Sequence, residues 1–335
     1  MAVVSVKDVA ERAGVSIGTV SNVMNHPEKV AEPSRARVLA AIEELGFSRN
    51  DAARQLREGR SRSIGFIVLD VRNPFFTEVA RGAEDRAAHE RLSVLLANSD
   101  QSVERESAHL DLFEQQRVHG VLISPIADVT ERLATLRERG IPAVLVDRAA
   151  PDASFSSVSV DDLAGGRMAV HHLIARGRRR LAYLGRQDLR QSTDRLQGAR
   201  AAVAEHPGVT LEVIELDALS VSAGRAVGAA IAARSVRPDA IFAANDLVAI
   251  GVLEAFMMGS SRISVPDDIA IIGYDDIDFA SAAVVPLSSI RQPAALMGRT
   301  AVELLLDEAA DPASPKRQVE FQPDVVVRAS TTTID

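Results

Sequence analysis

From residue 63 onward, short runs rich in Val, Ile and Leu alternate with amphipathic helical stretches such as Phe76–Glu90, Glu104–Gln116 and Leu163–Ala175. The apolar runs are Ile64–Val71, Leu92–Asn98, Gly120–Ser124, Pro142–Asp147, Ser157–Asp161, Leu181–Gly185, Leu211–Leu216, Ala240–Ala244 and Ile269–Tyr274. This pattern is typical of buried parallel strands in βαβ units. Nine such strands are more than we expect in a single sheet of this core. The pattern therefore predicts an α/β core over residues 63–335, built of two doubly wound parallel-sheet subdomains that split near residue 161.

The first 45 residues show helical spacing and no plausible strand. A helix is predicted over Val6–Ala13, followed by a turn at Gly14, and Ser16 is placed to cap a second helix that ends at Met24. A third helix is expected from about Pro33 to Gly46, with one face formed by Val38, Leu39, Ile42 and Leu45. A short helix, a glycine turn and a second helix form the helix-turn-helix plan, whose second helix enters the major groove of DNA.

The net charge of −8 is unevenly distributed along the chain. Residues 1–62 hold ten Lys and Arg against eight Asp and Glu, a balance of +2, whereas the remainder holds 28 against 38, a balance of −10. The basic character is therefore confined to the end that carries the helix-turn-helix pattern. The chain has no cysteine, which excludes disulfides, thiolate metal sites and cysteine nucleophiles.

No stretch is long and apolar enough to span a membrane, and no secretion signal opens the sequence, so we expect a cytoplasmic protein. Enzymatic motifs are absent, because no GxGxxG, Walker A, GxSxG or HExxH string occurs. The pair His171-His172 is expected to be a solvated helix end rather than a ligand pair, and no metal or cofactor is predicted.

The outward positions of the second helix predict how it contacts DNA. The side-chain amide of Asn22 suits the N6/N7 edge of adenine, Ile17 can contact a thymine methyl, and Gly18 offers no side chain. We therefore expect few contacts between this helix and the base edges. An ordinary three-helix bundle with a polar surface is the alternative that this spacing alone leaves open.

Four sequence segments decide between these alternatives. They are Val6-Lys-Asp-Val-Ala-Glu-Arg-Ala-Gly-Val-Ser16, Thr19-Val-Ser-Asn-Val-Met-Asn25, Arg37-Val-Leu-Ala-Ala-Ile-Glu-Glu-Leu-Gly-Phe47 and Asn50-Asp-Ala-Ala-Arg-Gln-Leu56. Together they resemble the headpiece of the lactose-repressor (LacI-type) family of bacterial transcription regulators. The resemblance implies a DNA-binding headpiece over residues 1–48 and a hinge helix and linker over 49–62, in which Leu56 wedges into the minor groove. The implied DNA-contacting residues are Ser5, Lys7, Ser16, Ile17, Thr19, Ser21, Asn22, Asn25, Arg54, Leu56 and Arg57.

The resemblance continues through the core, where several family-like segments lie at predicted strand ends: Asn73–Phe76, Gly120–Pro125, Val146–Arg148, Val160–Asp162, Ala244–Asp246 and Ile272–Asp276. It implies a type I periplasmic-binding-protein fold that binds an effector between its subdomains. The expected effector-binding residues are Asn73, Phe75, Phe76, Asp147, Arg148, Asp161, Arg195, Leu219, Asn245, Asp246 and Asp275. Four further aspartates are expected to cap helices instead: Asp162, Asp267, Asp268 and Asp276.

The mixture of carboxylates, amides and guanidinium groups suits a neutral polyhydroxyl ligand, so the expected effector is a monosaccharide. A purine or nucleoside remains the second class, although the chain has no Trp and only two Tyr to stack on a flat ring. The expectation is a homodimeric repressor that binds a near-palindromic operator and answers to this effector. A sugar-binding transport protein is the remaining alternative; it shares the core but lacks a headpiece.

Overall fold

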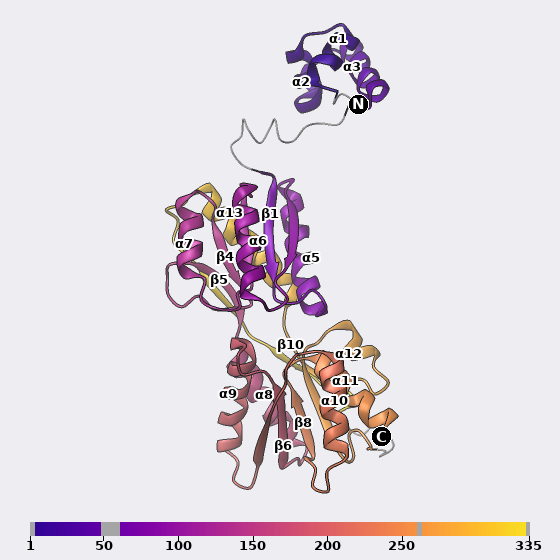
Figure 1. Cartoon of the computed structure of the whole chain (residues 1–335), viewed down its shortest axis with the longest axis vertical. Coiled ribbons are helices and arrows are strands. Elements are labelled where there is room, and N and C mark those ends of the chain that lie inside the picture. The colour runs from indigo at the N-terminus through magenta and orange to yellow at the C-terminus, as the bar shows by residue number, and fades with distance from the viewer. Residues whose placement is uncertain (1–3, 48–60, 260–262, 333–335) are drawn as a thin grey trace. The chain divides into compact units, whose positions relative to one another are not determined.

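The computed structural model of the chain describes residues 4–47, 61–259 and 263–332. It divides into two units, residues 1–60 and residues 61–335, which are described separately below (Figure 1). In the described part of the chain, no helix combines the length and the apolar character needed to cross a bilayer.

The first unit is a bundle of α1 (Val6–Ala13), α2 (Ile17–Asn25) and α3 (Glu32–Leu45), with a 3₁₀ turn η1 (Pro27–Lys29) between the last two. All three predicted helices are confirmed. Their shared core includes the fully buried side chains of Val9, Val20 and Val38. The prediction that Leu39 joins this core is wrong, since its side chain is 53% exposed. Residues 38, 41, 42 and 45 already form the inner stripe of α3, and position 39 lies outside it.

Local chemistry sets the ends of these helices. Ser5 and Asp8 form a capping box at the start of α1, and Gly14 ends that helix in the left-handed conformation, with φ at 63°. As predicted, Ser16 caps α2, because its Oγ accepts a hydrogen bond from the Thr19 backbone N–H at 3.0 Å. These two caps define the tight turn that a helix-turn-helix requires.

The second unit contains two six-stranded sheets, which confirms the predicted α/β core of two subdomains. The first sheet has the order β11-β5-β4-β3-β1-β2, and all of its strands run parallel: β1 (Ser63–Val68), β2 (Ser93–Asn98), β3 (Gly120–Ile123), β4 (Ala143–Val146), β5 (Ser156–Val160) and β11 (Gln318–Phe321). The second has the order β12-β10-β9-β8-β6-β7, with only the edge strand β12 antiparallel: β6 (Arg180–Gly185), β7 (Thr210–Glu215), β8 (Ala240–Ala243), β9 (Ala270–Asp275), β10 (Ser288–Arg291) and β12 (Asp324–Val326).

Three of these strands were not predicted. β10 begins with two serines and lacks the apolar run of a central strand, while β11 and β12 are short segments near the C-terminus. They show that the boundary near residue 161 marks only the first of three passages between subdomains. The chain returns to the first subdomain with α13 and β11, then crosses again to β12.

Helices lie against both sheets (Figure 1). They are α5 (Pro74–His89), α6 (Val103–Gln115), α7 (Thr130–Glu138), α8 (Asp162–Ala175), α9 (Arg190–Ala204), α10 (Val221–Ala232), α11 (Asp246–Met258), α12 (Asp278–Ala282) and α13 (Ala294–Ala310). Three pairs pack backbone to backbone at glycines: α5 with α13, α8 with α9, and α10 with α11. A Cβ on Gly298 of α13, for example, would lie only 1.9 Å from the carbonyl oxygen of Val79 in α5.

Candidate functional site

Residues at the carboxyl ends of the strands of both sheets meet around one small cavity of about 50 Å³, which we call the inner cavity. Asn73 follows β1, Asp147 follows β4 and Asp275 ends β9. Eight of the eleven expected effector residues line the inner cavity: Asn73, Phe75, Phe76, Asp147, Arg195, Leu219, Asn245 and Asp275. The topology of the two sheets therefore brings together most of the expected set.

Direct hydrogen bonds join the two subdomains beside this cavity. The Asn73 side-chain amide of the first subdomain donates to Asp275 Oδ2 of the second at 2.8 Å. In the other direction, Gln191 Nε2 of α9 donates to Asp147 Oδ2 at 2.9 Å and to the Asp147 carbonyl at 2.8 Å. Gln292 holds the second oxygen of Asp275, also at 2.8 Å. The cleft is thus closed by side chains that line the cavity or contact its lining.

Arg195 is the one buried cation of the site among the described residues, with 5% of its surface exposed. Its Nε donates to Asp162 Oδ1 at 2.7 Å, and Nη1 donates to the Ala244 carbonyl at 2.7 Å. The guanidinium carbon also lies 3.6 Å from the centre of the Tyr274 ring, in a cation–π contact. These three partners fix the position of the guanidinium beside the inner cavity.

The structure reverses the expected capping assignment of Asp161 and Asp162. Asp161 was expected to bind effector, but its Oδ1 caps α8 by accepting from the Ala164 backbone N–H at 2.8 Å. Asp162 was expected to be the cap, but it is buried and forms the ion pair with Arg195. The reason is positional, because α8 begins at residue 162 and the residue before it takes the capping place.

The buried carboxylates outnumber the buried cation. Burial raises the pKa of Asp275 to about 6, against the opposing effect of Arg195. Burial, together with the negative charge of Asp162, raises the pKa of Asp147 well above its usual value. Burial also raises the pKa of Asp162, although Arg195 opposes the shift. Three carboxyl groups beside one guanidinium give the site several acceptor oxygens, and a carboxyl that holds its proton donates as well, so the site suits a ligand that both donates and accepts hydrogen bonds.

Two of the expected effector residues form hydrogen bonds within the second subdomain that stabilise its fold. Asp246 is fully buried and does not line the inner cavity; its oxygens accept from Ser289 Oγ at 2.7 Å and from the Ile277 N–H at 2.9 Å. Asn245 reaches the inner cavity, but its Oδ1 caps α11 by accepting from the Val248 N–H at 3.0 Å.

The remaining aspartates assigned to capping divide into two kinds. Asp267 and Asp268 accept hydrogen bonds from Ser264, within the loop before β9. Asp276 caps no helix and instead forms ion pairs with Arg291 at 2.7 Å and with Arg328 at 2.6 Å. α12 begins two residues further on, at Asp278, so Asp276 is too early in the chain to cap it.

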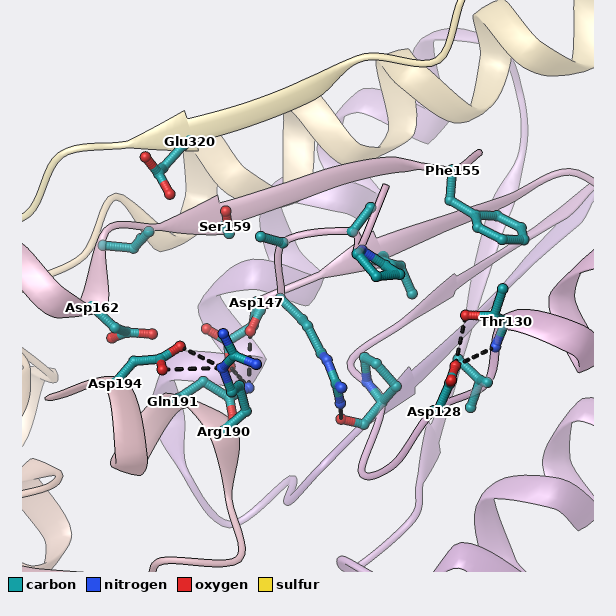
Figure 2. A pocket seen from close by; sticks show the side chains of 18 of the residues that line it. Asp128, Thr130, Asp147, Phe155, Ser159, Asp162, Arg190, Gln191, Asp194 and Glu320 are labelled. Atoms are coloured by element: carbon teal, nitrogen blue, oxygen red, sulfur yellow. Dashed lines mark hydrogen bonds and ion pairs between the residues drawn. The ribbon is translucent and has the colours of Figure 1, made fainter. Parts of the chain in front are cut away.

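A larger cavity of about 550 Å³ adjoins the inner one and shares Asp147 and Gln191 with it; we call it the outer cavity (Figure 2). The expected residues Arg148 and Asp161 line this cavity instead of the inner one. Arg148 donates to the Ala127 carbonyl at 3.2 Å. Acidic groups dominate its lining: Asp128, Asp147, Asp161, Asp162, Asp194 and Glu320.

Three residues of the site were missed by the sequence argument. Gln191 and Asp162 had detectable signals, because each lies in the first turn of a helix that follows a predicted strand, the position where α/β ligand sites gather. Gln292 follows β10, and since β10 was not predicted, no strand end marked it.

In the headpiece, α2 presents the expected side chains to solvent. Ile17 is 54% exposed, Ser16, Asn22 and Asn25 are exposed, and Thr19 and Ser21 are half-buried. An exposed isoleucine in the first turn of a helix contributes nothing to the bundle core, which leaves it available for contact with DNA. Ser5 and Lys7 are exposed on and before α1. Arg54, Leu56 and Arg57 lie outside the described residues.

Comparison with known proteins supports both units. Residues 5–50 match the family model of bacterial regulatory proteins, lacI family, and residues 170–331 match a periplasmic binding protein-like domain. The HTH-type transcriptional repressor PurR of Aliivibrio fischeri (strain ATCC 700601 / ES114) is 34% identical, with 98% of each chain covered. The chain belongs to the lacI family. The ribose operon repressor of Escherichia coli (strain K12) is 32% identical over 97% of this chain and 99% of its own.

The fold agrees with that membership. A crystal structure of the lac repressor dimer bound to operator and the anti-inducer ONPF superposes with a TM-score of 0.84, at 28% identity, covering 98% of this chain and 99% of the other. This lacI-family chain is therefore a DNA-binding transcriptional regulator with a ligand-binding core, and its relatives are repressors rather than enzymes.

Proposed function

We propose that this lacI-family protein represses transcription as a homodimer and that its effector is a monosaccharide bound in the inner cavity. The observation that carries the proposal is the closure of the cleft around a cavity rich in carboxyl groups by Asn73–Asp275 and Gln191–Asp147. Sugar hydroxyls donate as well as accept, so they satisfy carboxylates and a guanidinium together. Similarity to the ribose operon repressor supports the same ligand class.

The size of the inner cavity favours a compact effector. A volume of about 50 Å³ is less than that of two water molecules at roughly 30 Å³ each, so even a monosaccharide requires the cleft to open. We infer that the effector enters by separating the two bridging pairs and then replaces them with its own hydroxyls. The angle between the subdomains thereby changes, and a coupling of roughly 1–3 kcal/mol to the hinge region of residues 49–62 suffices for useful control of DNA binding.

Dimerisation is supported by large apolar side chains exposed on both subdomains. Leu95 and Leu96 lie on the edge strand β2 and are 38% and 44% exposed, while Met258 and Val284 of the second subdomain are 84% and 82% exposed. Apolar side chains left on an edge strand and at helix ends are typical of protein interfaces. A homodimer presents two headpieces to a near-palindromic operator. A cytoplasmic location follows from the same proposal.

A purine base or nucleoside is the second effector class, and the similarity to PurR repressors favours it. Phe75 and Phe76 line the inner cavity, but their rings pack against each other edge to face at 5.1 Å. That arrangement leaves less flat surface for a planar base than an unpaired ring offers.

Thermal unfolding of the full chain with panels of monosaccharides, purines and sugar phosphates tests the effector class. We expect a monosaccharide to raise the melting temperature and the sugar phosphates to have no effect, because the cavity is acidic. Stabilisation by a purine alone would transfer the site to the second class. DNA binding is tested separately by gel shift on the upstream region of the protein's own gene at low salt, and failure to bind there would refute the repressor.

A further inference from the structure

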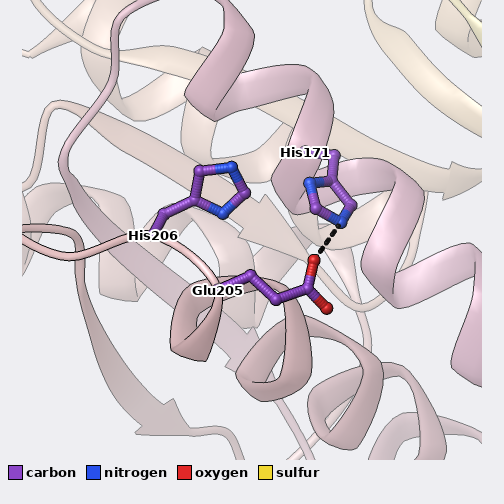
Figure 3. A group of neighbouring side chains, drawn as sticks. All are labelled: His171, Glu205 and His206. Carbon is purple, nitrogen blue, oxygen red and sulfur yellow. Dashed lines mark ion pairs between the residues drawn. The ribbon is translucent and has the colours of Figure 1, made fainter.

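Two histidines and a glutamate meet at the far ends of α8 and α9, away from both cavities. His171 lies in the last turns of α8, Glu205 is the C-cap residue directly after α9, and His206 follows it (Figure 3). His171 Nε2 lies 3.4 Å from Glu205 Oε2, and the two imidazole rings are 5.2 Å apart, centre to centre. One potential ligand atom from each residue lies within 4.8 Å of the others.

The hydrogen bonding of His206 leaves it prepared to bind a metal. Its Nδ1 lies 2.9 Å from the Ala202 carbonyl oxygen, and because a carbonyl only accepts, Nδ1 carries the proton. In the neutral ring, Nε2 then keeps a lone pair. A ring nitrogen bonded to a backbone carbonyl, with the other nitrogen open, is the arrangement that orients metal-ligating histidines.

The surroundings contain one favourable and one opposing charge effect. His171 lies near the C-terminal end of its helix and Glu205 at the end of α9, where the helix dipoles place partial negative charge and favour a cation. Arg167 opposes binding, because its guanidinium donates to Glu205 Oε1 at 2.8 Å. That bond leaves Oε2 for an ion and fixes the carboxylate, so Arg167 weakens the site without blocking it.

We propose that His171, Glu205 and His206 bind one divalent transition-metal ion of the zinc class and clamp the end of α8 to the end of α9. Two imidazoles and one carboxylate suit zinc, with water in the fourth position, whereas magnesium and calcium prefer oxygen ligands alone. Zinc bonds of about 2.0–2.1 Å place tetrahedral ligand atoms roughly 3.3 Å apart. The side chains of His171 and Glu205 are 37% and 45% exposed, so rotation of their outer bonds can close the remaining distance.

The clamp acts on the same two helices that form the effector site. Asp162 at the start of α8 and Arg195 within α9 form the buried ion pair beside the inner cavity. The ion would therefore join the helices at the end opposite to that pair. The metal site requires neither a sugar nor DNA, so its failure and the failure of the proposed function are distinguishable.

The test uses full-length protein without an affinity tag, stripped with chelator and titrated calorimetrically with zinc chloride at about pH 7.5. We expect one ion per chain, and cobalt should give visible absorption bands of a four-coordinate site. His206→Gln and His171→Gln should each weaken zinc binding at least about 10-fold, whereas His89→Gln, an exposed histidine on α5, should leave it unchanged.

A variant that is expected to bind zinc more tightly separates loss of a ligand from loss of the fold, because a misfolded protein does not gain zinc affinity. Arg167→Gln removes a positive charge from the neighbourhood of the ion and should tighten zinc binding several-fold. Zinc affinity that is equal in the wild type, His171→Gln and His206→Gln would overturn the proposal, as would no binding below about 1 mM zinc.

Discussion

At the scale of single residues, Asp275 shows that the proposed effector site lowers the stability of the fold. Both of its oxygens accept from side-chain amides, those of Asn73 and Gln292, yet burial still raises its pKa to about 6. A carboxyl group with a raised folded-state pKa stabilises the fold while it is protonated, and that contribution is lost as the pH rises through the folded value. Above about pH 6 the ionised Asp275 is therefore held in the protein at a cost.

Asp275→Asn should remove this pH dependence. With a folded pKa of about 6 and an unfolded value of about 3.9, the wild type should lose roughly 2 kcal/mol relative to the variant between pH 4.5 and 7.5. Gln292 Oε1 has no hydrogen-bond partner among the described residues, so a flip of that amide can accommodate the new donor. Urea unfolding at both pH values measures the difference. If the wild type and Asp275→Asn differ in stability by the same amount at both pH values, the pKa of Asp275 is not raised by folding.

At the scale of elements, glycines decide how closely the helices pack. α5 and α13, α8 and α9, and α10 and α11 each approach so closely that a Cβ at their glycines would lie about 2 Å from a backbone oxygen of the other helix. Neither helix of a pair can move outward without uncovering the sheet below, since both contribute buried side chains to the same core. Small residues at these crossings therefore set the position of α9, and with it Gln191 and Arg195.

Gly298→Ala should destabilise the protein although alanine is the better helix former. The added methyl group meets the Val79 carbonyl, and overpacking of this kind costs about 1–3 kcal/mol, more than the gain of up to about 1 kcal/mol in helix propensity. Chemical unfolding of the purified variant measures the effect. Arg299→Ala, at the exposed neighbouring position, is the matched control and should change stability by less than about 0.5 kcal/mol. A stabilised Gly298→Ala would contradict the close packing.

At the scale of the whole molecule, each unit possesses its own buried core. One described apolar cluster contains only headpiece residues, and the other three contain only residues of the second unit. The residues of both cavities likewise come from the second unit alone. The ligand-binding part of this regulator therefore contains all the packing that it needs to fold.

A fragment of residues 61–335 should fold without the headpiece. We expect its main calorimetric unfolding transition to lie within about 2 °C of the corresponding transition in the full chain, because no buried side chain of its core is lost. It should also lose all specific DNA binding, since α2 is absent. A transition lowered by more than about 5 °C would show that the headpiece contributes to the stability of the core.

Much of the fold could be predicted from local pattern. Nine strands and the helices of the headpiece are confirmed, because apolar periodicity, the Ser16 cap and the Gly14 turn depend only on residues that are close together in the sequence. The strand β10 was not predicted, because its two serines are buried by their neighbours rather than by their own hydrophobicity. The role of Leu39 was misjudged for a related reason, since periodicity gives the stripe of a helix only to within one position.

The sequence by itself determined which unit reads DNA, which unit binds a ligand and which strand ends carry polar groups, because these follow from the order of residues along the chain. Only the tertiary structure decided that Asp162 rather than Asp161 pairs with Arg195, and that Gln191 and Gln292 donate hydrogen bonds to Asp147 and Asp275. It also decided that His171 lies beside Glu205 and His206. Such contacts join residues far apart in sequence, and their partners are chosen by helix starts and packing distances that no local pattern contains.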